Sequence, residues 1–223
     1  MAPDQVVRAR RGRPGYDLES LLAVAVQVFN ERGYDGTSME DLSQRLGISK
    51  SSIYYHVDSK EDLLAYALDR ALDGLFSVAD QVTAQHGAAS DAPAIELLEQ
   101  LVRGSVAVLH ERLPYVTLLL RARGNTATER KALARRREFD QIVADLVARA
   151  ERDGDIRPDV DPAVTARLLF GLVNSLVEWY RPASAAGGAP VIDGAQLADA
   201  VCAVAFDGLR IRAHAAEHTP TRQ

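Results

Sequence analysis

The sequence is 223 residues long, 47% apolar, and carries a formal net charge of −5 and one cysteine. This composition is ordinary for a globular chain with a core, and a single cysteine excludes an internal disulfide framework. The acidic balance excludes a basic nucleic-acid coat. No eighteen apolar residues run uninterrupted, and the arginine-rich start lacks the apolar segment of a secretory signal, so we expect a cytoplasmic protein with no membrane partner.

Residues 1–15 form a basic segment with four arginines against one aspartate. Pro3, Gly12, Pro14 and Gly15 oppose regular structure, so we expect a flexible arm. Such a segment is either a solubilising tail or an arm that places arginines in a DNA minor groove. The second interpretation is the better one if a DNA-binding motif follows directly.

A first helix is predicted from Asp17, which can cap its start, to Gly33, which can end it. Its apolar residues recur at helical spacing and would form a small core beneath the helices that follow. They are Leu18, Leu21, Leu22, Ala25, Val28 and Phe29.

The next stretch has the pattern of two short helices joined by a tight turn. Thr37 and Glu40 match a capping box at the start of the first. Gly47 interrupts that helix, and Ser49 can cap a second one that runs to Tyr55. Two such helices form the helix-turn-helix pattern, whose second helix lies in the major groove of DNA.

The second helix of this pair is unusually polar. It crowds hydroxyl, amine and aromatic groups around one apolar residue, Ile53, where a surface helix more often carries Glu, Ala or Leu. The alternative is a capped helical hairpin in an unrelated all-α domain. Because caps are common, they alone would favour that alternative, and the whole ordered string is what favours DNA recognition.

Three strings carry a resemblance to a known family: Gly33 to Ser38, Leu46 to Val57, and Ser59 to Leu63. Together they look like the DNA-binding domain of a TetR-family transcriptional regulator, and the match runs from about Tyr16 to Leu64. Ser43 stands where the family usually has Ala, and Val57 where Phe is usual. Both residues are small or apolar enough to pack in those places.

The motif and the resemblance imply a set of DNA contacts. The start of the second helix would reach base edges or phosphates, its aromatic end would set the register on the backbone, and the arm would follow the minor groove. Lys60, at the next helix start, could meet a phosphate beside the positive helix N-terminus. The candidate DNA-binding residues are Arg11, Arg13, Thr37, Ser49, Lys50, Ser51, Ser52, Tyr54, Tyr55, His56 and Lys60.

Helical periodicity continues to the C-terminus. Helices are predicted at 60–85, 94–111, 113–124, 128–153, 162–181 and 194–214, and Asp161 with Pro162 marks a capped start. No β-period segment of useful length and no repeat appear, so we expect an all-α protein of nine helices. The expected parts are an arm at 1–15, a three-helix DNA-binding domain at 16–62, a six-helix ligand-binding and dimerisation bundle at 63–214, and a disordered tail at 215–223.

The last two predicted helices are strongly apolar or rich in small residues. We infer that they pair with their counterparts in a second subunit as a two-fold four-helix interface, and the resemblance implies the same. The weaker alternative is that they merely bury each other. The candidate interface residues are Leu172, Leu176, Trp179, Val201, Val204 and Leu209.

Polar residues interrupt the apolar faces of the bundle, including an arginine run at 135–137 beside Phe139. Each residue singly is better explained by a structural partner or by solvent. As a set, cationic and amide groups around an apolar bundle suit an amphiphilic, anionic ligand. The candidate ligand-binding residues are Arg103, His110, Arg121, Arg123, Asn125, Asn174, Glu178 and Trp179.

Residues 118–126 and 173–180 are similar to TetR regulators of fatty-acid, sterol or aromatic acyl-CoA catabolism. This looser resemblance implies an effector of the acyl-CoA type. Arg121 and Arg123 would then be partners for its phosphates, and the bundle interior would hold its acyl part.

The leading hypothesis is a homodimeric repressor that a small amphiphilic ligand releases from double-stranded operator DNA. A helical-bundle enzyme with a carboxylate-bridged metal site is one alternative, but no glutamate has a histidine three residues on. A DNA-binding protein without a ligand is another, disfavoured by the size of the second domain. We therefore expect no enzymatic activity, no cofactor and no metal.

Overall fold

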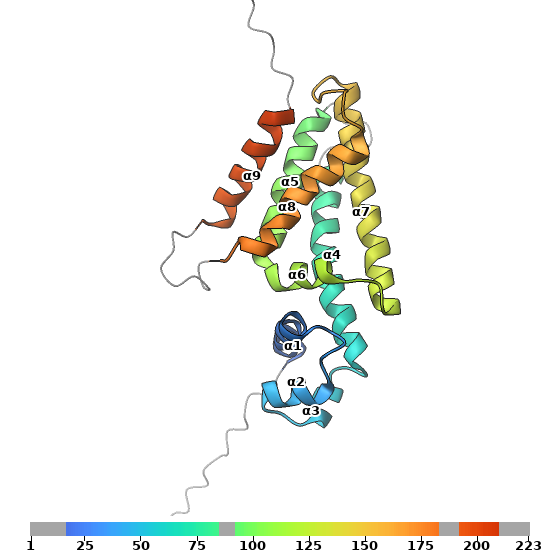
Figure 1. Ribbon diagram of the computed structural model, residues 1–223, viewed down its shortest axis with the longest axis vertical. Coiled ribbons are helices and arrows are strands. Elements are labelled where there is room, and N and C mark those ends of the chain that lie inside the picture. The colour runs from blue at the N-terminus through green and yellow to red at the C-terminus, as the bar shows by residue number, and fades with distance from the viewer. Residues whose placement is uncertain (1–16, 85–91, 183–191, 210–223) are drawn as a thin grey trace, which may run out of the picture. The chain divides into compact units, whose positions relative to one another are not determined.

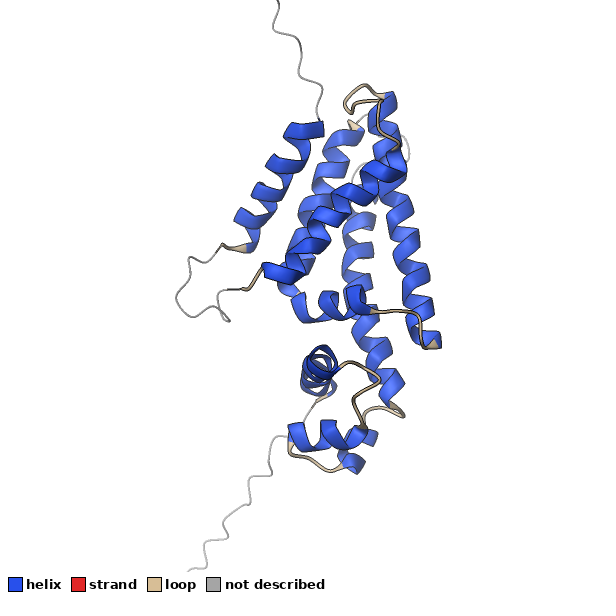
Figure 2. Ribbon diagram, viewed as in Figure 1, coloured by secondary structure: helices blue, strands red, loops and turns tan. Residues whose placement is uncertain are grey.

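The computed structural model describes residues 17–84, 92–182 and 192–209. Its helices are α1 (Leu18–Arg32), α2 (Met39–Leu46), α3 (Lys50–Tyr54), α4 (Lys60–Ala84), α5 (Ala94–Glu111), α6 (Leu113–Arg121), α7 (Ala127–Arg152), α8 (Pro162–Trp179) and α9 (Gly194–Leu209). These three ranges hold all nine predicted helices and no strand (Figure 2), so the all-α prediction is confirmed. Within them, no helix is both long and apolar enough to cross a membrane.

The start and the end of α1 are formed as predicted. The carboxylate of Asp17 accepts a hydrogen bond from the backbone N–H of Ser20 at 2.8 Å, and this bond lowers the pKa of Asp17. At the other end, Gly33 has a φ of 81°, in the left-handed region where a side chain would be strained. The chain can therefore turn sharply there toward α2.

The capping box of α2 lies one residue later than predicted. Ser38 is the N-cap: its hydroxyl accepts from the N–H of Asp41 at 3.2 Å, and the Asp41 carboxylate accepts from the N–H of Ser38 at 2.8 Å. Thr37 is buried, and its hydroxyl donates to the Gly33 carbonyl at 2.8 Å. The predicted box of Thr37 and Glu40 was wrong, because both neighbouring hydroxyls fit the pattern and only the loop from Gly33 decides between them.

The chain forms two compact units, one ending at Tyr66 and one beginning at Ala67, so their boundary falls inside α4. In the first unit α1 packs on α2, and α2 on α3. The predicted apolar face of α1 is buried except for Leu18, which is exposed at the helix start. The same core takes in Leu42, Leu46 and Ile53.

The second unit is a helical bundle with α5 at its centre. Figure 1 shows α5 between α7 and α9, and α8 running alongside α7. α4 and α5 approach closely at two glycines: a Cβ on Gly104 would lie 2.3 Å from Val78 Cγ1, and one on Gly74 would lie 2.9 Å from Val108 Cγ1. The absence of a side chain at both positions is therefore what allows this approach.

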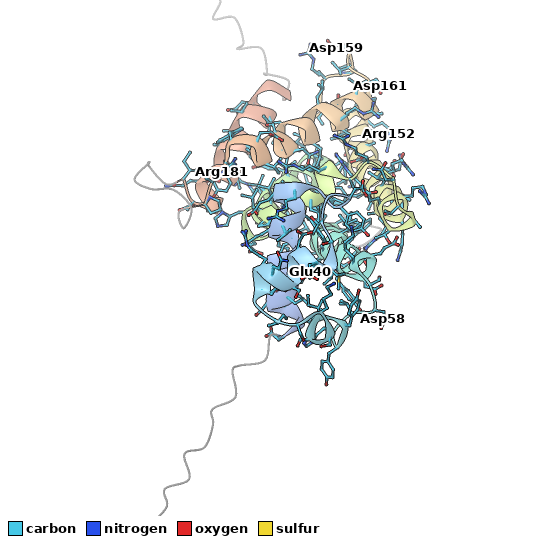
Figure 3. The ribbon with its side chains drawn as sticks, turned by 60° about the horizontal axis from the view of Figure 1, so that its bottom comes forward. Glu40, Asp58, Arg152, Asp159, Asp161 and Arg181 are labelled. Atoms are coloured by element: carbon cyan, nitrogen blue, oxygen red, sulfur yellow. The ribbon has the colours of Figure 1, made fainter. Side chains whose placement is uncertain are left out.

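Several helix ends in the second unit differ from the prediction by a few residues. α6 ends at Arg121 and α8 at Trp179, both earlier than predicted. α7 begins with a capping box in which Thr126 Oγ1 accepts from the N–H of Glu129 at 3.0 Å. Asp161, labelled in Figure 3, caps α8 as predicted. Residues 210–214 of the predicted last helix, the arm and the tail lie outside the described residues.

Candidate functional site

One cap and one anchor fix the position of α3. The hydroxyl of Ser49 accepts from the N–H of Ser52 at 3.2 Å, and Ile53 is fully buried in the first unit. Most of the other side chains of the turn and helix are exposed. Those of Lys50, Ser51, Ser52, Tyr54 and Tyr55 are exposed, and Tyr55 is 86% exposed. The first unit thus presents an ammonium, hydroxyls and phenols together, which are groups that donate to phosphates and base edges.

An ion pair links Lys50 to the preceding helix. Its Nζ lies 2.6 Å from Oε2 of Glu40, which is labelled in Figure 3, and both side chains are about half exposed. The hydrogen bond from Lys50 lowers the pKa of Glu40, and it raises the pKa of Lys50. Because exposed ion pairs are weak in water, a DNA phosphate could take the place of Glu40.

The end of α3 is aromatic. Tyr55 follows the last helical residue, and its ring packs edge-on against His56 with the ring centres 5.2 Å apart. His56 is half-buried. The predicted minor-groove residues Arg11 and Arg13 lie outside the described residues.

The side chains of Lys60 and Thr37 form hydrogen bonds inside the fold, and their DNA contacts stay a prediction. Lys60 Nζ donates to the carbonyls of Tyr34 at 2.8 Å and Thr37 at 2.6 Å, and lies 4.2 Å from the centre of the Tyr34 ring. The hydroxyl of Thr37 is bonded to Gly33. Lys60 therefore ties the start of α4 to the loop before α2. Tyr34 lies 26 positions before it in the sequence and Thr37 lies 23 positions before it.

The second unit contains a small apolar cavity walled by α4 to α8. Its volume is about 30 Å³, roughly the space of one water molecule. The apolar walls include Leu75, Leu109, Val116, Leu119, Phe139 and Phe170. Ser105 also lies in the wall, but its hydroxyl already donates to the carbonyl of Leu101 at 2.7 Å.

Three polar side chains complete the lining of this cavity. Arg136 and Asp140 come from α7 and Asn174 from α8, and we call them the α7–α8 mouth. Asp140 is exposed, but protein atoms around its carboxylate displace part of its water and raise its pKa, while Arg136 and Arg167 act in the opposite direction. The mouth is thus a polar edge on an otherwise apolar cavity.

Arg103 and His110 have structural partners instead of facing this cavity. Arg103 forms ion pairs with Glu99 on its own helix, at 3.1 Å, and with Asp199 on α9. His110 Nδ1 lies 2.6 Å from the hydroxyl of Tyr180, at the end of α8. In this structure they hold α8 and α9 against α5, and their role in binding a ligand stays a prediction.

Five of the other predicted ligand residues are exposed. Arg121 ends α6, and Arg123 and Asn125 lie in the loop before α7. Glu129 fixes that loop, because its carboxylate accepts from the backbone N–H of Arg123 at 3.1 Å. Glu178 and Trp179 are exposed at the end of α8.

Of the eight predicted ligand residues, all of which the structure describes, Asn174 alone lines the cavity. Arg136 and Asp140 were missed. A signal for them exists, because they lie four residues apart on one helix face beside Phe139. The arginine run itself does not reveal which of its members faces the cavity.

Two other arginines attach α4 to the rest of the second unit. Arg135 donates to Asp69 at 2.7 Å and to Asp73 at 2.8 Å. Arg112, between α5 and α6, donates to the carbonyl of Arg70 at 2.6 Å. α4 is therefore held by charge-assisted bonds from two different parts of the bundle.

Several large apolar side chains are exposed on α8 and α9, and we call them the apolar stripe. Leu168 is 66% exposed, Trp179 57% and Val204 on α9 70%, and Val164 is exposed one turn before Leu168. Exposed apolar patches of this kind mark interaction surfaces. The stripe shows which faces of the two helices remain uncovered in one protomer.

The predicted interface residues divide between this stripe and the core. Trp179 and Val204 belong to the stripe, and Leu172 is half-exposed. Leu176 and Val201 are buried within the protomer, and their place in an interface stays a prediction. The side chain of Leu209 lies outside the described part.

Two family models match the chain and together cover most of it. One, described as bacterial regulatory proteins of the tetR family, matches residues 21–67. The other, described as a tetracyclin repressor-like C-terminal domain, matches residues 91–209. The division agrees with the two compact units, whose boundary follows Tyr66.

Relatives and solved structures point the same way. The chain is 30% identical over 208 residues to the HTH-type transcriptional repressor KstR2 of Rhodococcus jostii, covering 89% of this chain and 93% of that protein. It is similar to SCO3833, a TetR regulator from Streptomyces coelicolor, with 53% identity, coverage of 92% and 98%, and a TM-score of 0.76. It is also similar to AibR in complex with isovaleryl coenzyme A and operator DNA, with 25% identity, coverage of 84% and 97%, and a TM-score of 0.66.

The helix-turn-helix of the first unit, the helical bundle of the second and both family matches lead to one conclusion. The chain belongs to the TetR family of DNA-binding transcriptional regulators.

Proposed function

We propose that the protein is a homodimeric repressor that leaves its operator when a small amphiphilic effector enters the cavity of the second unit. One observation carries this proposal. Leu75 of α4 is part of the cavity wall, and the same helix is continuous from Lys60 in the first unit. A ligand that displaces this wall therefore acts on the helix that continues into the DNA-binding unit.

On DNA, two copies of α3 would lie in successive major grooves, roughly 34–36 Å apart. Lys50, Ser51 and Ser52 would reach base edges or phosphates. Tyr54, Tyr55 and His56 would set the register on the backbone, and Arg11 and Arg13 would follow the minor groove. The exposure of Tyr55 and the outward side of α3 support this assignment.

The second copy would cover the apolar stripe on α8 and α9. Pairing the stripe with itself about a two-fold axis removes its apolar surface from water in both protomers at once. It would also set the distance between the two copies of α3. Val164, Leu168, Trp179 and Val204 are the residues that we expect in this interface.

The cavity is too small for a ligand, so ligand binding must be accompanied by movement of its walls, which include α4. Pockets that bury small ligands measure roughly 300–1,000 Å³, about ten times or more the 30 Å³ present here. An effector must therefore bind a conformation in which the walls have moved apart. It shifts the protein toward that conformation only by binding it more tightly than the closed one.

An acyl-CoA thioester is the effector class that we propose first. Its support is the solved complex of AibR with isovaleryl coenzyme A and operator DNA. Arg121 and Arg123 are exposed just after Leu119 and Leu120, which line the cavity. They remain the candidate partners for the CoA phosphates, with the acyl part in the cavity.

The test combines thermal unfolding with operator release. The purified protein is melted with free fatty acids and with short, long, aromatic and steroid acyl-CoAs, and a ligand should raise the midpoint by mass action. Each compound that does so is then added to the protein bound to DNA from upstream of its own gene. We expect one compound both to stabilise the protein and to release the DNA.

Tyr55→Ala is the matched control, because Tyr55 lies on α3 and not at the cavity. It should lose operator binding and keep the full ligand-induced rise in melting midpoint. Stabilisation without release in the wild type would contradict the proposed coupling, and no stabilisation by any compound would contradict the proposed effector class.

A further inference from the structure

The α7–α8 mouth combines hydrogen-bonding groups of opposite kinds at the edge of an apolar cavity. The Arg136 guanidinium only donates, an ionised Asp140 carboxylate only accepts, and the Asn174 amide does both. The cavity walls behind them are leucine, valine and phenylalanine side chains. A ligand in this cavity would therefore place one polar group beside all three residues.

These polar groups are not used to hold the fold together. Across residues 17–84, 92–182 and 192–209, no hydrogen bond or ion pair joins the side chain of Arg136, Asp140 or Asn174 to another residue. By contrast, Arg135, the residue before Arg136, forms ion pairs with Asp69 and Asp73. Polar groups that lose water on ligand binding need partners of matching type, or binding is weakened.

The mixture of donors and acceptor restricts the group that can fill the mouth. A hydrocarbon would leave all three side chains without partners, and an ester would leave Asp140 without a donor. A carboxylate or phosphate could accept from Arg136 but would offer Asp140 no donor and would meet its like charge. A hydroxyl or a secondary amide satisfies both sides, because it donates to Asp140 and accepts from Arg136 or Asn174.

We propose that the α7–α8 mouth recognises a neutral group that both donates and accepts a hydrogen bond, a hydroxyl or a secondary amide, attached to the apolar body that fills the cavity. The proposal rests on the proposed function, in that an effector occupies this cavity. It narrows the effector to oxygenated or amide-bearing amphiphiles and places the polar recognition on α7 and α8.

The test uses four probes that share an eight-carbon body. N-methyloctanamide and 1-octanol donate and accept, methyl octanoate only accepts, and octanoate is an anion. Affinity for the full chain is measured by calorimetry and by the shift in melting midpoint. We expect the amide or the alcohol to bind about tenfold or more tightly than the ester, the ratio expected for a hydrogen bond to a charged group. Comparison of N-methyloctanamide with 1-octanol shows whether the mouth prefers a secondary amide or a hydroxyl.

Two matched pairs of variants assign the preference to the mouth. Asp140→Asn is compared with Glu138→Gln, an exposed acid of the same helix that does not line the cavity. Arg136→Met is compared with Arg137→Met, its exposed neighbour. Asp140→Asn should lower the amide-to-ester ratio several-fold, because the neutral Asn carbonyl is a weaker acceptor than a carboxylate. It should also tighten octanoate, while Glu138→Gln and Arg137→Met keep the wild-type ratios.

The binding results separate a failure of this inference from a failure of the proposed function. Equal binding of ester and amide, or a ratio that survives Asp140→Asn, overturns this inference and leaves the proposed effector-released repressor standing. The inference is also overturned, and the repressor proposal kept, if none of the four probes binds while an acyl-CoA releases operator DNA. If neither the probes nor the acyl-CoAs bind, the proposed function itself fails, and the inference fails with it.

Discussion

Three consecutive arginines on α7 have three different environments. Arg135 donates to Asp69 and Asp73 and lies over the ring of Phe76, 5.2 Å from its centre. Arg136 lines the cavity, and Arg137 is exposed. Successive helix positions are about 100° apart, so one short run of identical residues can reach a neighbouring helix, a cavity and solvent.

Lys60→Met is expected to destabilise the first unit. The substitution keeps an apolar stem but leaves the carbonyls of Tyr34 and Thr37 without their donor, at a cost of about 1–3 kcal/mol. Tyr55→Ala should leave the unfolding midpoint unchanged and weaken operator binding. Thermal unfolding and fluorescence anisotropy with operator DNA measure both. A Lys60→Met protein of normal stability with reduced DNA affinity would support the predicted phosphate contact.

Asp140→Asn should stabilise the protein slightly at neutral pH. Burial raises the pKa of Asp140 above its ordinary 3.8, so its ionised form is less favourable in the folded chain than in the unfolded one. The midpoint should rise slightly. The difference should shrink as the pH falls through the raised pKa and vanish below 3.8, where the folded and the unfolded states both hold the proton. Glu138→Gln serves as the control. A destabilised Asp140→Asn protein would show that the carboxylate has a partner in the fold.

At the scale of the element, α4 is the helix that links the DNA-binding unit, the packing against α5 and the cavity. It is capped by Ser59, whose hydroxyl accepts from the N–H of Asp62 at 3.1 Å. Further along, it meets α5 at Gly74 and Gly104 and contributes Leu75 to the cavity. Its residues therefore decide both how closely it packs and how it would respond to a ligand.

Gly104→Ala tests the close approach of α4 and α5. The new Cβ would lie 2.3 Å from Val78 Cγ1, and overpacking of this kind costs about 1–3 kcal/mol. The higher helix propensity of alanine offsets up to about 1 kcal/mol of it. We expect a lower unfolding midpoint, restored in large part by Val78→Ala in the same chain. Denaturant unfolding of both single variants and the double variant gives the coupling, and additive effects would argue against the contact.

At the scale of the whole molecule, the two units carry different features. The first exposes α3 with its donors and phenols, and the second holds the cavity and the apolar stripe. Only one helix, α4, runs through both among the described residues. In our proposal a second copy on the stripe fixes the spacing of the two copies of α3, so dimerisation is a condition for operator binding.

Leu168→Glu should therefore abolish operator binding by preventing dimerisation. A two-fold axis places two copies of the new charge close together in an apolar interface, which should weaken association by roughly a hundredfold or more. Leu18→Glu, at another exposed leucine outside the stripe, is the control. Analytical ultracentrifugation reports the oligomeric state. A dimeric Leu168→Glu protein, or a monomeric wild type, would contradict the proposed interface.

The helices and the family could be predicted from the sequence because their signals are local. Asp17, Ser49 and Asp161 cap their helices as predicted, each bonding within three residues. Gly33 and Gly47 end α1 and α2 with positive φ, as their positions indicated. A capping box, a left-handed glycine and a periodic apolar face involve neighbours along the chain, so their residues can be recognised before any tertiary contact is known.

The tertiary structure alone decided what the polar side chains do. His110 meets Tyr180 at 70 positions' distance, and Arg103 meets Asp199 at 96. Both arginine and histidine suit a ligand as well as they suit such partners, so composition could not separate the two uses. The α7–α8 mouth likewise exists only because α7 and α8 pack side by side. Local bonding determines the helices, whereas the role of a long polar side chain depends on which distant residue the packing brings within its reach.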